Sequence, residues 1–196
     1  MAPKVSSFAA FRGSGSVPSE RPGGTELTGW QAFTLEPRTA AHAEAMFAVL
    51  ADPALYEFVE ETPPLSVEAL RDRFARSESQ QSPDGTEHWL NWVVRGASRE
   101  VAGYVQATVE ANLDTNVAYM FGKAHWGQGL ATRAVSSMLD AVASEFGVTR
   151  FFIVAERANP RSIRVAERLG FAAAPAEVVV RKGIAATDVL MQKRLP

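Results

Sequence analysis

Hydrophobic and polar residues alternate with two different periods along this chain. Three closely spaced segments rich in β-branched and aromatic residues have the pattern of strands, and short turns separate them: residues 88–95, 101–109 and 116–121. Strands joined in this way pair antiparallel, so we expect a meander over this part of the chain. Residues 30–36 have the pattern of an earlier strand of the same sheet.

Other segments repeat their apolar residues every three or four positions, which is typical of helices. The expected helices are residues 39–50, a segment capped by Ser66, residues 129–146 and residues 159–169. Between the last two, residues 150–155 form a continuous apolar run, typical of a strand covered on both faces. We expect residues 177–181 and 187–194 to close the domain as a hairpin across Lys182 and Gly183.

Composition divides the chain into two parts. Residues 1–29 contain five Gly, five Ser and three Pro without an apolar period, which predicts a flexible tail. The apolar patch at residues 8–11 ends at Arg12, so it is too short for a secretory signal. Residues 30–196 are long enough to bury one core, and we expect them to form a single domain.

Charge and residue counts exclude several classes of function. With 20 Lys and Arg against 22 Asp and Glu, the net charge is −2, which does not favour a nucleic-acid partner. The chain has no cysteine and three scattered histidines, so we expect no disulfide and no metal site. No apolar run is long enough to span a bilayer, and we therefore expect a cytoplasmic protein without a membrane partner.

The first segment with chemical content is a predicted strand, loop and helix. Residues 119–121 end the strand, and the loop Trp126-Gly127-Gln128-Gly129-Leu130-Ala131-Thr132 leads into the helix. Small residues let the backbone approach a ligand, and the unpaired first-turn amides of a helix favour a phosphate. The loop lacks the Lys-Ser/Thr ending of a P-loop and the third glycine of the dinucleotide fingerprint. By itself it also fits a plain strand-to-helix turn.

The second segment is Asn159-Pro160-Arg161-Ser162, which continues to Gly170-Phe171. Asn159 and Ser162 lie three residues apart at a helix start, directly after a buried strand. Taken alone, this is a capped helix with Asn159 as its cap. Combined with the glycine loop some 30 residues earlier, it is much more specific.

Together the two segments resemble the GNAT superfamily of acyl-CoA-dependent N-acetyltransferases. The glycine loop looks like the Trp-Gly-x-Gly-x-Ala-Thr loop of its Rim-type branch, which acetylates ribosomal-protein N-termini, and Asn159-x-x-Ser162 with Val165-x-Glu167-x-x-Gly170-Phe171 looks like the second CoA motif. The resemblance implies an α+β fold with a largely antiparallel sheet of six to seven strands. The sheet would be splayed between the fourth and fifth strands and flanked by about four helices.

The resemblance also implies acetyl-CoA as co-substrate, no metal, and a set of binding residues. The residues that would contact acetyl-CoA are Met120, Phe121, Gly127, Gln128, Gly129, Leu130, Ala131, Thr132, Asn159 and Ser162. Amides of the glycine loop would bind the pyrophosphate, and the open strand edge at Met120 and Phe121 would bind the pantetheine arm. By the same resemblance, Ser162 would protonate the departing thiolate.

The expected reaction moves an acetyl group directly to a primary amine, either a protein N-terminus or a small molecule. Residues 115–119 lack the Glu of many relatives, and no tyrosine follows Tyr119. Glu61 is our candidate base, with Glu60 and His125 as alternatives. Two alternative functions are a non-catalytic acyl-CoA-binding module and a nucleotide-binding protein of another fold. A homodimer is an alternative to a monomer.

Overall fold

The computed structural model describes residues 11–12 and 32–196. Their strands form one sheet in the order β1-β2-β3-β4-β5-β6-β8-β7. The strands are β1 (Phe11–Arg12), β2 (Phe33–Pro37), β3 (His88–Gly96), β4 (Val101–Val109), β5 (Asp114–Phe121), β6 (Arg150–Glu156), β7 (Ala172–Ala173) and β8 (Asp188–Arg194). All neighbouring pairs are antiparallel except β5 and β6, which confirms the expected mixed, largely antiparallel sheet.

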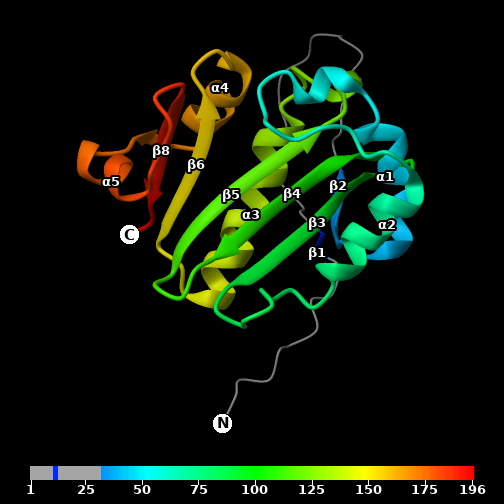
Figure 1. Ribbon diagram of the computed structural model, residues 1–196, viewed down its shortest axis with the longest axis horizontal. Helices are drawn as coiled ribbons and strands as arrows, with labels where there is room; N and C mark the ends of the chain where they lie inside the picture. Colours follow the sequence, from blue (N-terminus) through cyan, green and yellow to red (C-terminus); the bar gives the residue numbers. More distant parts are fainter. Residues whose placement is uncertain (1–10, 13–31) are drawn as a thin grey trace, which may run out of the picture.

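Helices cover both faces of this sheet (Figure 1). They are α1 (Ala43–Leu50), α2 (Val67–Arg76), α3 (Leu130–Phe146), α4 (Pro160–Arg168) and α5 (Ala176–Arg181), with short 3-10 turns η1 (Ala40–His42), η2 (Pro53–Tyr56) and η3 (Lys123–His125). Helices α1 and α2 lie in front of β2–β4 in Figure 1, and α3 lies behind the sheet. Because strand side chains alternate, Val93 packs with α1 and α2 while its neighbour Val94 packs with α3.

Strands β5 and β6 pair over only three residues, and this makes the sheet splay. Asp114–Asn116 of β5 pair with Arg150–Phe152 of β6, after which the two strands diverge toward the end that carries α4 (Figure 1). The other edge of β6 stays paired with β8 along all seven residues, so the opening lies between β5 and β6. We call the region between residues 117–121 and 153–156 the split.

One expectation about the C-terminal end of the chain needs correction. Residues 177–181 form helix α5 rather than a strand, so the closing hairpin was wrong. Both edges of β8 already have partners in β6 and β7, and the β-branched segment instead packs Val178 against Phe152 and Leu190. At the other end, Phe11 and Arg12 of the expected tail pair with β2, while residues 1–10 and 13–31 lie outside the described residues.

The base of the split is held by a buried carboxylate. Asp114 is 2% exposed and contacts Arg150 of β6, with Lys182 at 3.8 Å and Arg181 at 3.9 Å. Lys182 also binds Glu110 at 3.0 Å. One buried carboxylate thus links the start of β5 to β6 and to the end of α5.

We expect Asp114→Ala to lower the free energy of unfolding by about 2 kcal/mol, because it removes the buried carboxylate that Arg150 and the partly buried Lys182 contact. Urea denaturation followed by circular dichroism measures the change. Glu61→Ala is the control, since it removes a carboxylate from the half-exposed ion pair with Arg73 and should cost less than about 1 kcal/mol. Equal losses in both variants would contradict a structural role for Asp114.

Candidate active site

The glycine loop connects the open end of β5 to helix α3. Gly127 and Gly129 have φ angles of 75° and 72°, a left-handed conformation that other residues adopt only with strain. No atom lies within 4 Å of where a Cβ would stand on either glycine, so the loop backbone borders open space. The side chain of Gln128 turns back and donates to the carbonyl of Ala124 at 2.8 Å.

The first turn of α3 presents unsatisfied donors. The amide of Arg133 is bonded to Gly129, whereas the first-turn amides of Leu130, Ala131 and Thr132 precede the intrahelical pattern. The hydroxyl of Thr132 is buried and has no hydrogen-bond partner among the described residues. Unsatisfied amides, an orphaned hydroxyl and the positive end of a 17-residue helix fit a phosphate-bearing ligand.

Only alternate residues of β5 direct their peptide groups into the split. The amide of Gly122 bonds to Ala102 of β4, which sets the alternation of the antiparallel ladder. Met120 therefore faces β4 with its peptide groups, and its side chain packs beside α1 and α2. Tyr119 and Phe121 turn their peptide groups toward the split, where the indole of Trp126 binds the Phe121 carbonyl at 2.8 Å.

Helix α4 brings the second motif to the opposite side of the split. The side chain of Asn159 accepts the amide of Ser162 at 3.1 Å, so Asn159 caps the helix. The Tyr119 hydroxyl lies 2.9 Å from Ser162 Oγ and donates to the Ser162 carbonyl at 3.1 Å. Burial raises the pKa of the Tyr119 phenol above its ordinary value, and the phenol keeps its proton at neutral pH.

Tyr119 is the residue that the sequence analysis missed. It stands two residues before Phe121, so strand alternation places both on the same face and directs their peptide groups to the same edge. This two-residue spacing could have identified Tyr119 from the sequence. The side-chain contact with Ser162, which is 43 residues away along the chain, depends on the fold.

The candidate bases lie away from the Tyr119–Ser162 pair. Glu61 forms an ion pair with Arg73 of α2 at 3.0 Å, with both side chains about half exposed, and Glu60 is exposed. His125 lies beside Gly122, and burial lowers the pKa of its imidazole, which is therefore neutral at pH 7. The structure thus brings together Ser162 and Tyr119, and it places Glu61 on the side of α1 and α2.

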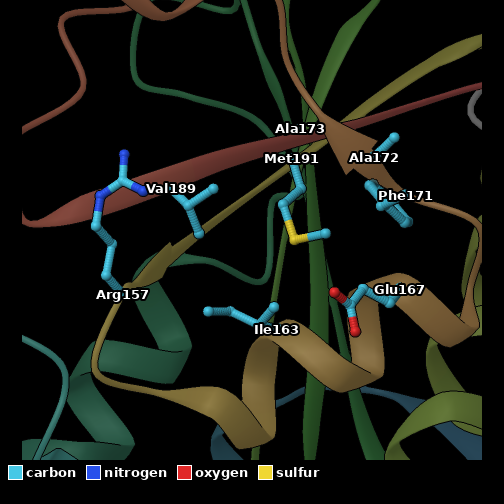
Figure 2. A pocket seen from close by; sticks show the side chains of 8 residues that line it. All are labelled: Arg157, Ile163, Glu167, Phe171, Ala172, Ala173, Val189 and Met191. Atoms are coloured by element: carbon cyan, nitrogen blue, oxygen red, sulfur yellow. The ribbon is translucent and has the colours of Figure 1, made fainter.

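A hollow of about 490 Å³ lies between α4 and strands β7 and β8 (Figure 2). Ile163 and Glu167 of α4 border it together with Met191 of β8 and the two residues of β7. Because β8 and β7 follow β6 in the sheet order, this hollow is separated from β5 and does not belong to the split.

The described residues hold neither a metal-binding cluster nor a membrane-spanning helix. Among residues 11–12 and 32–196, no group of three or more His, Asp or Glu side chains is arranged to hold a metal ion. In the same part of the chain, every helix is too short or too polar to cross a membrane.

Comparisons with known proteins agree with this geometry. Residues 33–172 match the family described as acetyltransferase (GNAT) domain. The uncharacterized protein YkkB of Bacillus subtilis is 30% identical over 102 residues, and the matched part covers 43% of this chain and 59% of YkkB.

Two solved structures share the fold. Spermidine N-acetyltransferase from Vibrio cholerae, in complex with CoA and spermine, has 14% identity and a TM-score of 0.64 over 83% of this chain and 94% of its own. Ribosomal-protein-S5-alanine acetyltransferase from Vibrio fischeri has 16% identity and a TM-score of 0.65 over 83% of this chain and 92% of its own. Since the family match spans well over half of the chain, the protein belongs to the GNAT acetyltransferase family.

Proposed function

We propose that the protein transfers an acetyl group from acetyl-CoA directly to a primary amine. The observation that carries this proposal is the split itself. The open glycine loop and α3 border it, and the contact between Tyr119 of β5 and Ser162 of α4 spans it. A thioester arm laid in the split would pass both features.

Most of the proposed acetyl-CoA contacts are main-chain groups. Amides from Gly127 to Thr132 would bind the pyrophosphate, with the Thr132 hydroxyl as a further donor. The outward peptide groups of Tyr119 and Phe121 would bind the pantetheine amides as an added strand does. Asn159 would approach the same arm from α4, and Met120 would border it on the acceptor side.

The acyl transfer needs residues that stabilise the oxyanion, protonate the departing thiolate and accept the proton of the amine. The amine nitrogen attacks the thioester carbon, and the outward N–H of Phe121 or Tyr119 would stabilise the oxyanion. When the C–S bond breaks, the Ser162 hydroxyl would give its proton to the thiolate sulfur, and Tyr119 would hold that hydroxyl in place. Glu61, through water, is our candidate to receive the amine proton at the acceptor side.

Two structural neighbours and the loop before α3 support the proposed acceptor class. The names of the two neighbours, a spermidine N-acetyltransferase and a ribosomal-protein-S5-alanine acetyltransferase, indicate two kinds of acceptor on this fold. We propose a protein N-terminus or a small amine, and we place the chain nearest the Rim-type branch because of its Trp126–Thr132 loop.

A second candidate function is a non-catalytic acyl-CoA-binding module. It is favoured by the residues of β5 that face α1 and α2, since Asn116 and Ala118 supply no carboxylate to the split. It is also favoured by the ion pair that ties Glu61 to Arg73.

Titration calorimetry tests the binding half of the proposal. We expect saturable binding of acetyl-CoA and none of ATP or NAD. Thiol release with a panel of spermidine, an aminoglycoside and a peptide beginning with alanine then tests turnover. Binding without amine-dependent thiol release would favour the module, and preference for ATP or NAD would overturn both functions.

A further inference from the structure

The side chain of Arg161 joins three separate segments at the wide end of the split. Arg161 is the second residue of α4, directly before Ser162. Its guanidinium carbon lies 4.2 Å from the centroid of the Trp126 ring and 6.0 Å from that of Phe58, and its Nη2 lies 3.6 Å from Glu57 Oε2. Both ring distances are within reach of a cation–π contact.

The three partners differ in how firmly they are held. Trp126 packs against the core on the α3 side and on the α1 and α2 side, and its indole is hydrogen-bonded to Phe121, so its ring is held firmly next to β5. Phe58 and Glu57 belong to residues 57–61, which follow η2 and carry no helix or strand. We call residues 57–61 the acceptor-side loop. Arg161 therefore connects α4 to a fixed aromatic ring and to a loop with little regular structure.

The close stacking partner of Arg161 is Trp126, whereas Phe58 and Glu57 connect it to the loop by two weaker contacts. The Arg161 and Glu57 side chains are 49% and 60% exposed, so their attraction is screened by water. A planar guanidinium can lie on an aromatic ring and still direct its N–H groups to a carboxylate, which the compact ammonium of lysine does less well.

We propose that Arg161 is a positioning residue that holds the acceptor-side loop across the wide end of the split. The proposal rests on the acetyltransferase function and gives two neighbouring residues of α4 different roles. Ser162 would act on the thioester, and Arg161 would order the loop that carries Glu61, the candidate base for the amine. Acceptor affinity then depends on Arg161, whereas acetyl-CoA affinity does not.

Amide hydrogen exchange of the acceptor-side loop, residues 57–61, tests the loop contact without any turnover. We expect Arg161→Ala to speed exchange in this segment by about threefold or more, with Arg161→Lys between it and the parent protein. Arg168→Ala is the matched control, because it removes an exposed cation from the last turn of the same helix and should leave the segment unchanged. Unchanged exchange in Arg161→Ala, with the parent melting temperature, would overturn the proposal.

Kinetics with the best amine of the panel test the consequence. Arg161→Ala should raise the acceptor KM by about three- to tenfold, with kcat and the acetyl-CoA Kd each within about twofold. A Kd for acetyl-CoA weakened by the same factor as KM would assign Arg161 to the cofactor site and overturn the proposal. Failure of the parent protein to bind acetyl-CoA would instead remove the acetyltransferase function, and the exchange experiment would still report on the loop.

Discussion

Gly129→Asp is expected to weaken acetyl-CoA binding by at least about 100-fold, a loss near 3 kcal/mol. The new carboxylate would stand at the N-terminus of α3, where the pyrophosphate is proposed to bind, and would compete for the same amides while repelling the phosphates. No atom lies within 4 Å of where a Cβ would stand on Gly129, so the new side chain starts in open space and the fold should survive. Titration calorimetry measures the loss, and circular dichroism checks the fold.

Two control variants separate charge at the site from backbone strain. Gly129→Ala keeps the strain of the left-handed conformation without the charge, and it should weaken binding much less. Gly85→Asp adds the same residue at a φ of 72° in open space within the turn before β3, far from α3 along the chain. If Gly129→Asp bound acetyl-CoA as tightly as Gly85→Asp does, the glycine loop would not be the pyrophosphate site.

Ser162→Ala is expected to lower kcat by about 100-fold and to change the acetyl-CoA Kd by less than about threefold. The cap of α4 uses the backbone amide of Ser162, so removing the hydroxyl leaves the helix start intact. The proton for the departing thiolate would then have to come from water. Steady-state kinetics with calorimetry in parallel measure the two quantities, and matched losses would mean that Ser162 only binds.

Tyr119→Phe tests whether the two hydroxyls act as a unit. It removes the hydrogen bonds to the Oγ and carbonyl oxygen of Ser162 but keeps the ring in the core. We expect a loss in kcat smaller than that of Ser162→Ala, and no further loss in the double variant, because Tyr119 acts through Ser162. Additive losses would contradict this coupling and give Tyr119 an independent role.

The elements that the sequence determined are those where local pattern and burial agree. The apolar stripe from Leu130 to Phe146 predicts α3, and the alternation of β3 and β4 predicts a meander, since each pattern matches one period only. The glycine loop and the Asn159 cap are local features too, because left-handed backbone and helix capping depend on neighbouring residues. Family membership follows from the same segments.

Tertiary structure decided what depends on partners distant along the chain. Residues 177–181 have a strand's composition but form α5, and β8 pairs instead with β6 along its whole length and with β7 at Met191 and Gln192. The meeting of Tyr119 with Ser162, and of Arg161 with Trp126 and Phe58, requires the early divergence of β5 from β6 and the placement of α4 across it. Sequence periodicity identifies which face of an element is buried, but only the packed chain determines which residues meet there.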